Sequence, residues 1–114
     1  MSNRASYIWM MAILAAASGY SAYMVSRLPD IVPTHWNAAG KADQYGSKWL
    51  NLLLSPGLIL FMIVLTMALP ALSPKNYSLD SFRGTYNLLM VGLTGLFLYI
   101  HIVLLISSAD PGGN

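Results

Sequence analysis

The chain has 114 residues, of which 56% are hydrophobic and only 9% are charged, and its mean hydropathy is +0.57. This composition lies outside the range of ordinary soluble domains and predicts a membrane protein. The formal net charge of +2 comes without a basic stripe of interleaved aromatic residues, so we expect no nucleic-acid partner. Cysteine is absent, which excludes disulfide bonds and thiolate chemistry within the chain.

Three apolar runs divide the chain, and each has about the 20 residues that a helix needs to cross the hydrocarbon of a bilayer. Backbone amides in lipid must pair within their own segment, and no strand pattern here would close a barrel. We therefore expect an all-α integral membrane protein, a single domain with three transmembrane helices and a structured polar loop between the first two. The expected order within residues 1–114 is a helix at 7–25, the polar loop at 26–48, a helix at 49–72, a loop at 73–85, a helix at 86–108 and a tail at 109–114.

The first apolar run has two interpretations. Arg4 precedes the run, and Ala15 and Ala17 fit the small-residue rule for signal-peptide cleavage. The spacing of Ala15 and Gly19 also forms a small-residue pair, which lets a neighbouring helix approach closely. We favour helix packing through Ala15 and Gly19 over cleavage.

Pro56 interrupts the second apolar run. It either kinks one long helix or stands at the first helical position after an N-cap at Ser55, which would leave 49–54 as an interfacial turn. The sequence alone does not distinguish the kinked helix from the separate interfacial turn. Pro70 and Pro74 are expected to end the second helix. Ser78 and Asp80 are candidate caps for the start of the third helix.

The lysine and arginine residues divide evenly between the two expected sides of the membrane. One side carries Arg4, Lys75 and Arg83, and the other carries Arg27, Lys41 and Lys48. The α-amino group adds one positive charge to the side that carries Arg4, and the more positive side is expected to be cytoplasmic, so we expect a cytoplasmic N-terminus. The polar loop and the tail would then lie outside.

The polar loop contains several residues that bend or cap the chain. Pro29 and Pro33 bias the residues before them toward extended backbone, and Gly40 suits a turn with positive φ. Asp43 or Ser47 would cap the helix that follows.

The order of residues in this loop also carries a resemblance. It runs Leu28, Pro29, Asp30, Pro33, Thr34, His35, Trp36, Asn37, Gly40, Asp43, Gly46, Ser47 and Lys48. This order resembles the signature loop of the SdpI-like family, and more narrowly the domain of unknown function that forms the N-terminal half of SdpI-type bacterial immunity proteins. The later segments "SPKNYSLDSFRGTYNLLM" and "FLYIH" resemble the second loop and third helix of that domain. The resemblance therefore covers nearly the whole chain, as one three-helix half.

This resemblance implies a multi-pass protein of the bacterial cytoplasmic membrane. SdpI-type proteins protect producing cells from a secreted membrane-active peptide, and they relay its presence by holding a repressor at the membrane. Immunity and signalling are therefore expectations for this chain, with an amphipathic peptide as a partner.

The third apolar run carries a polar residue at every seventh position, at Asn87, Thr94, His101 and Ser108. This spacing keeps the four on one helix face with about 20° of drift per step. A polar stripe inside a membrane helix should face protein or water. On an adjoining face, close helix packing is expected through Gly92 and Gly95, beside Thr94.

An odd number of spans returns the end of the third helix to the side of the polar loop. We therefore expect a shallow polar pocket, with the polar loop above it and His101 at its base. His35 also has a purely structural interpretation, as a hydrogen-bonding group. The candidate binding residues are Asp30, His35, Trp36, Asn37, Asp43, Lys48 and His101.

Two functions compete for this architecture. The first is non-catalytic binding of a peptide, lipid or protein partner through the loop. The second is an accessory subunit of a respiratory or photosynthetic complex, docked onto other transmembrane subunits or onto a second copy of itself. No cofactor is expected in the first case, whereas the second allows a haem or chlorophyll ligated by His101. The sequence lacks an H-E-x-x-H helix, a G-x-S-x-G elbow and a P-loop, so we expect neither an enzyme nor a metal site.

Overall fold

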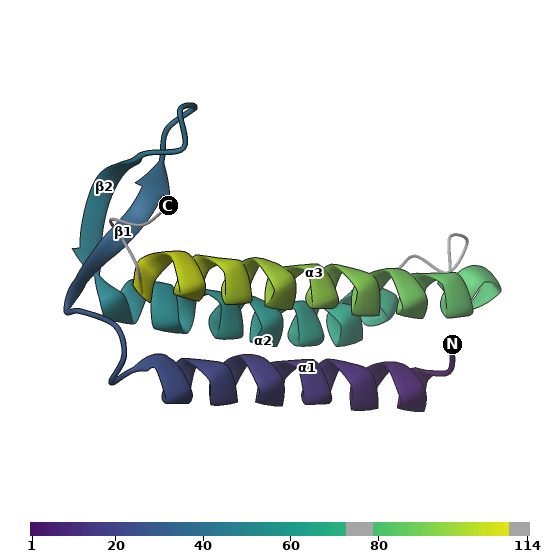
Figure 1. Cartoon of the computed structure of the whole chain (residues 1–114). Coiled ribbons are helices and arrows are strands. Elements are labelled where there is room, and N and C mark those ends of the chain that lie inside the picture. The colour runs from purple at the N-terminus through teal and green to yellow at the C-terminus, as the bar shows by residue number, and fades with distance from the viewer. Residues whose placement is uncertain (73–78, 110–114) are drawn as a thin grey trace.

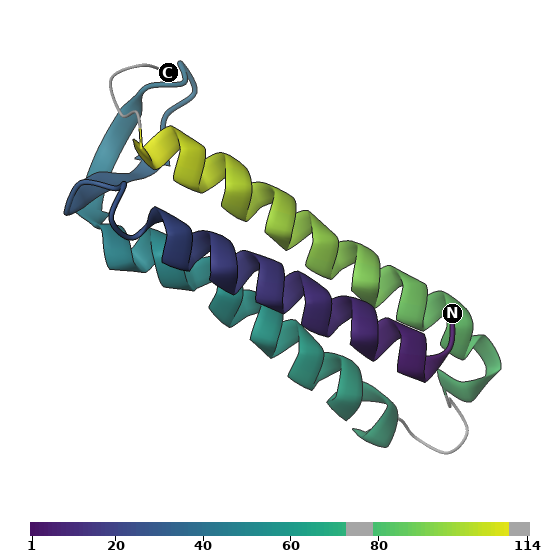
Figure 2. The same cartoon turned by 60° about the horizontal axis from the view of Figure 1, so that its bottom comes forward.

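The computed structural model describes residues 1–72 and 79–109, which form three long helices with a small hairpin at one end (Figure 1 and Figure 2). The helices are α1 (Asn3–Met24), α2 (Lys48–Leu72) and α3 (Arg83–Ala109), and a short 3-10 helix, η2 (Leu79–Phe82), leads into α3. The three predicted helices are confirmed, and the first and third are longer than expected. They lie side by side along a molecule that measures 53 × 29 × 18 Å.

The expectation of an all-α chain is wrong for the polar loop, because this loop forms a two-stranded antiparallel sheet. Strand β1 (Ile31–Trp36) pairs with β2 (Ala42–Ser47), with an irregular register around His35. The extended backbone expected around Pro33 is therefore correct. The second strand was missed because its sequence, ADQYGS, shows neither alternation of apolar residues nor a cluster of β-branched ones.

Two of the helices are long and apolar enough to cross a membrane, α2 and the segment Leu79–Ala109 that contains α3. Helix α1 has 22 residues, which is sufficient length, but small and polar residues such as Ser6, Ser18 and Gly19 dilute its apolar content. Length and composition therefore make these two helices candidate membrane spans, and a span through α1 stays a prediction.

Helix α2 runs without a break from Lys48 to Leu72 and contains both Pro56 and Pro70. This excludes the alternative in which residues 49–54 form a separate turn. The predicted end of the helix at residue 72 is confirmed, but Pro70 does not stop the helix, because it lies inside the last turn. The predicted stop at Pro74 and cap at Ser78 lie outside the described residues, and Asp80 lies within η2.

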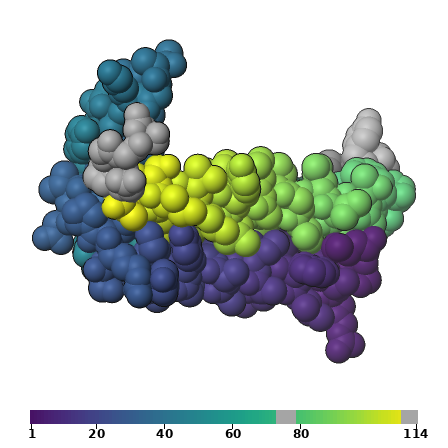
Figure 3. All heavy atoms as spheres, in the orientation of Figure 1, coloured from purple at the N-terminus to yellow at the C-terminus, as the bar shows by residue number. Residues whose placement is uncertain are grey.

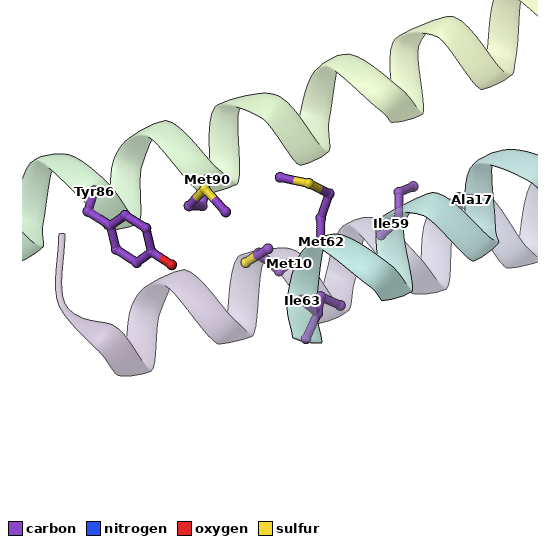
Figure 4. Packing of buried hydrophobic residues seen from close by; sticks show 7 residues of the cluster. All are labelled: Met10, Ala17, Ile59, Met62, Ile63, Tyr86 and Met90. Atoms are coloured by element: carbon purple, nitrogen blue, oxygen red, sulfur yellow. The ribbon is translucent and has the colours of Figure 1, made fainter. Parts of the chain in front are cut away.

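The apolar core lies where the three helices meet (Figure 4). Its buried members come from all three helices and include three methionines; they are Met10, Ala17, Ile59, Met62, Ile63, Tyr86 and Met90. Outside this core, large apolar side chains such as Trp9, Phe61 and Leu89 are more than half exposed. The outward faces of the bundle are therefore as apolar as its interior, which is what a lipid environment favours.

Candidate binding site

The hairpin stands at one end of the bundle and projects beyond its flank (Figure 3). Its base is fixed by a second apolar cluster, in which Leu28 and Val32 pack with Met24, Leu52 and Leu105. Each of the three helices contributes one residue to this cluster. The position of the hairpin is therefore set by the ends of all three helices together.

Asn51 joins the hairpin to α2 and α3 by hydrogen bonds. Its buried side-chain amide donates to the backbone carbonyl of Pro33 in β1 (2.8 Å) and to Oγ of Ser108 in α3 (2.9 Å). Sequence reasoning missed Asn51, although an amide inside an apolar run is itself a signal of internal hydrogen bonding.

Lys48, a predicted binding residue, has a structural role. Its Nζ donates to the carbonyl of Val25 (2.8 Å), the C-terminal cap residue of α1, and the side chain is only 13% exposed. A cation at that position satisfies a free carbonyl and complements the helix dipole. Asp30 lies 3.7 Å from the same ammonium group but is 95% exposed, and its backbone carbonyl accepts from the Lys48 N–H (2.9 Å).

Asn37 and Gly40 form the turn between the strands. The side-chain oxygen of Asn37 accepts from the N–H groups of Ala39 (2.9 Å) and Lys41 (3.1 Å). Gly40 has φ of +78°, which confirms the predicted glycine turn. Asn37 is therefore occupied in shaping the turn, and Ser47 caps α2 by accepting from the Trp49 N–H (3.2 Å).

His35 and Asp43 form a pair across the hairpin, with Nδ1 of the imidazole 2.6 Å from Oδ1 of the carboxylate. The side chains are 59% and 40% exposed. A carboxylate that accepts from Nδ1–H fixes the ring and leaves Nε2 as the nitrogen that can engage a ligand. None of the described residues bonds this Nε2, and the half-buried Trp36 and the exposed Tyr45 belong to the same two strands.

The expected pocket with a roof at His35 and a floor at His101 is not formed. His101 is fully buried within the bundle, where its Nε2 lies 2.8 Å from Oγ of Ser21 in α1, and its ring meets that of Tyr20 edge to face. Its contacts within the described residues therefore run to α1 and not to the hairpin. The C-terminal end of α3 does lie at the hairpin end of the bundle, but the His101 imidazole points toward α1 and away from the hairpin.

The polar stripe on α3 does face protein, as predicted, because Asn87, Thr94, His101 and Ser108 are all at most 1% exposed. At the end of the bundle away from the hairpin, Asn87 donates to the backbone carbonyl of Met1 (3.0 Å) and to the side chain of Asn3 (2.7 Å). Near the hairpin, His101 and Ser108 bond to residues of α1 and α2. The stripe therefore joins α3 to its neighbours at both ends.

The two prolines of α2 leave two carbonyls without a helical donor, and both carbonyls find a hydroxyl elsewhere. Proline has no N–H, so Pro56 frees the carbonyl of Leu52 and Pro70 frees that of Thr66. Ser21 of α1 donates to the first (2.6 Å), and Tyr86 of α3 donates to the second (2.8 Å). Each helix that packs on α2 thus repairs one gap in its backbone hydrogen bonding.

The bond to the Leu52 carbonyl also determines the tautomer of His101. Ser21 has a single hydroxyl proton, and donating that proton to Leu52 leaves its oxygen only as an acceptor. With Ser21 as the acceptor, Nε2–H of the neutral imidazole donates to it, and the buried Nδ1 then carries no proton and has no hydrogen-bond partner among the described residues. His101, Ser21 and the Leu52 carbonyl form a relay that links α3, α1 and α2 in that order.

Ligation of a haem or a chlorophyll by His101 does not fit this arrangement. Nε2 is bonded to Ser21, and although Nδ1 has no hydrogen-bond partner among the described residues, the side chain has no exposed surface through which a macrocycle could reach it. The helices would have to separate before a macrocycle reached the ring. Among the described residues, no group of three or more His, Cys, Asp or Glu side chains lies close enough together to hold a metal ion.

Within residues 1–72 and 79–109, Ala15, Gly19, Gly92 and Gly95 form no close contact between helices. Ala15 is exposed, and a Cβ added at Gly19, Gly92 or Gly95 would meet nothing within 4 Å. The buried small residues of α1 are instead Ser6, Ala17 and Ser21. Thr94 of α3 is buried and donates to the carbonyl of Met90. Packing through Ala15, Gly19, Gly92 and Gly95 onto another chain stays a prediction.

Comparison with known protein families gives a match in the region of the hairpin. Residues 12–60 are similar to the family model of a domain of unknown function, DUF1648. The matched region begins in α1, contains the whole hairpin and ends in α2 just beyond Pro56. It therefore includes the His35–Asp43 pair and two members of the relay, Ser21 and Leu52. No curated protein and no solved structure matches the chain.

Proposed function

We propose that this protein spans the bacterial cytoplasmic membrane three times and binds a peptide or protein partner through its hairpin. The distribution of charge supports the three spans. No Asp, Glu, Lys or Arg occurs in 5–26, 49–74 or 84–109, so the bodies of all three helices carry no formal charge. The N-terminus is then cytoplasmic and the hairpin is outside, with membrane lipids around the helices.

The observation that carries the binding function is the exposed His35–Asp43 pair. Asn37 shapes the turn of the hairpin, and Lys48 and Asn51 hold the hairpin end of the bundle together. The pair contributes to none of these attachments, yet Asp43 fixes the His35 ring within a hairpin that the three helix ends hold in place. A rigid, exposed donor or acceptor beside aromatic rings suits recognition of a polypeptide. Hydrolysis is less well supported, because no nucleophilic side chain of residues 1–72 or 79–109 is hydrogen-bonded to the pair.

The likeness to SdpI-type proteins supports a secreted membrane-active peptide as that partner, since the same loop carries the resemblance. An amphipathic cationic peptide would place its charges near Asp43 and Asp30 and its apolar side chains against Trp36 and Tyr45. Immunity is the corresponding physiological function. It is tested by comparing the sensitivity of cells that express the wild-type chain or His35→Ala to such a peptide.

Photo-crosslinking tests partner binding without a known ligand. A benzophenone amino acid replaces Tyr45 on the hairpin or Leu89 on the lipid-facing side of α3, and native membranes are irradiated. We expect a discrete polypeptide adduct from position 45 that is lost in His35→Ala, and lipid adducts from position 89. Identical lipid adducts from both positions would contradict the proposal.

One observation favours the second function, that of an accessory subunit. A shallow apolar groove runs along the outer face of α2 and is lined by Trp49, Leu50, Leu53, Leu54, Gly57 and Leu58. The missing side chain at Gly57 forms its floor, which suits a ridge of another transmembrane helix. Extraction in mild detergent followed by mass spectrometry tests this function: foreign subunits should copurify with the wild-type chain and be lost in Gly57→Leu.

A further inference from the structure

Helix α2 is weakest at Pro56. The bond from residue 56 to the Leu52 carbonyl is missing, and the next residue, Gly57, has no side chain that would restrict the backbone. Gly57 is exposed on the outer face of α2, and a Cβ added there would meet nothing within 4 Å, so no neighbouring helix supports the backbone on that side. Sharp bends in long helices occur at such proline and glycine positions.

The part of α2 before Pro56 is clamped to the hairpin end. Lys48 holds the end of α1, Asn51 holds β1 and α3, and Leu52 lies in the apolar cluster under the hairpin. These contacts fix the first two turns of α2 in both position and direction.

The part of α2 after Pro56 rests on an adaptable core. Ile59, Met62 and Ile63 pack there against Met10 and Met90. Methionine side chains are flexible and fill irregular spaces, so this core can repack with little loss of contact. Among the described residues, one hydrogen bond joins this part of α2 to another element, from Tyr86 to the Thr66 carbonyl, whereas Lys48 and Asn51 make three such bonds before Pro56. The part of α2 beyond Pro56 is therefore held by fewer and softer interactions than the part before it.

We propose that α2 is hinged at Pro56, and that the relay from His101 through Ser21 to the Leu52 carbonyl is the latch that keeps the hinge closed. While Ser21 occupies that carbonyl, the gap in α2 is bridged and the helix continues straight across the core. When the Ser21 hydroxyl no longer donates to it, the Leu52 carbonyl has no hydrogen-bond donor. The helix then bends at Pro56, and residues 57–72 move away from α1. This device goes beyond the proposed function, because it requires no ligand and holds whatever the hairpin binds.

Distances between two spin labels test the hinge, and the absence of native cysteine leaves no background labelling. Trp9→Cys on α1 and Leu72→Cys on α2 place both labels on exposed positions at the end of the bundle away from the hairpin. In Ser21→Ala we expect the ratio of long to short distances to rise about fivefold, the change that loss of one hydrogen bond produces. Thr94→Val is the matched control, because Thr94 donates to a carbonyl of its own helix that no proline has freed, and it should leave the ratio unchanged.

The decisive variants remove the proline. Pro56→Ala restores the N–H that donates to the Leu52 carbonyl, so it should lower the fraction of molecules with a long distance between the two spin labels. In the double variant, Pro56→Ala should cancel the effect of Ser21→Ala. Pro56→Ala also keeps the test valid if Ser21→Ala fails to fold. A Ser21→Ala population that matches the wild type, or one that Pro56→Ala does not reverse, would overturn the latch.

Discussion

Tyr86 in α3 donates its phenolic hydroxyl to the backbone carbonyl of Thr66 in α2 across 2.8 Å, and that carbonyl is the one that Pro70 deprives of its helical partner. Both side chains are buried, with Tyr86 7% exposed and Thr66 fully covered. The contact explains how α2 passes Pro70 and continues to Leu72. A hydroxyl from another helix takes over the role of the missing N–H.

Removing that hydroxyl should destabilise the bundle by about 1 kcal/mol, because a buried carbonyl loses its donor. We predict this loss for Tyr86→Phe, measured as unfolding of the purified protein in mixed micelles. In a Pro70→Ala background the restored N–H serves the same carbonyl, so Tyr86→Phe should then cost much less. Equal costs in both backgrounds would show that the hydroxyl acts elsewhere.

The hairpin base depends on apolar packing, and Val32 is its most deeply buried strand residue. Val32→Ala removes two methyl groups and should cost about 2 kcal/mol. Ile31→Ala, on a neighbouring residue that is 61% exposed, is the control and should cost little. Protease cleavage within the hairpin is expected to speed up in the first variant alone, and similar cleavage rates for both would count against docking through Val32.

Lys48 should contribute to stability in a way that Lys41 does not. Lys48→Met leaves the Val25 carbonyl at the end of α1 without its donor, which we expect to cost about 1 kcal/mol, whereas Lys41→Met changes an exposed side chain. Denaturation of the two variants in the same micelles separates the roles. If Lys48→Met unfolds no earlier than Lys41→Met, the cap contributes nothing.

The turn requires glycine at position 40, where φ is +78°. Gly40→Ala forces a Cβ into the left-handed region, which costs about 1 kcal/mol. Gly19→Ala, in the exposed middle of α1 with nothing within 4 Å of the new Cβ, should instead leave stability unchanged or raise it. Both variants are compared by thermal unfolding, and a neutral Gly40→Ala would contradict the observed turn.

The helices and the polar stripe were predictable because both follow from local patterns. Long apolar runs give the helices, and a seven-residue spacing gives the shared face of Asn87, Thr94, His101 and Ser108. The hairpin was not predictable as a sheet, since β2 has no strand pattern of its own and is held by its register with β1 and by the docking of β1 on the bundle.

The partners of single side chains were also beyond the sequence. Nothing in the local sequence indicates that Ser21 donates to Leu52, because the two lie on different helices and meet only after packing. Pro56 did carry a usable signal, since a proline within a membrane helix always frees the carbonyl four residues earlier. Searching the other helices for small hydroxyl residues at matching depth would have identified Ser21 as a candidate donor.

The central claim is that α1 crosses the membrane together with α2 and α3, so that the hairpin lies on the opposite side from the N-terminus. Single cysteines at Ser2, Tyr45 and Phe82 test this with a membrane-impermeant maleimide applied to intact cells and to inverted vesicles. We predict that Tyr45→Cys reacts in intact cells, and that Ser2→Cys and Phe82→Cys react only in inverted vesicles. Labelling of Ser2→Cys and Tyr45→Cys from the same side would show that α1 does not span the membrane and would contradict the account.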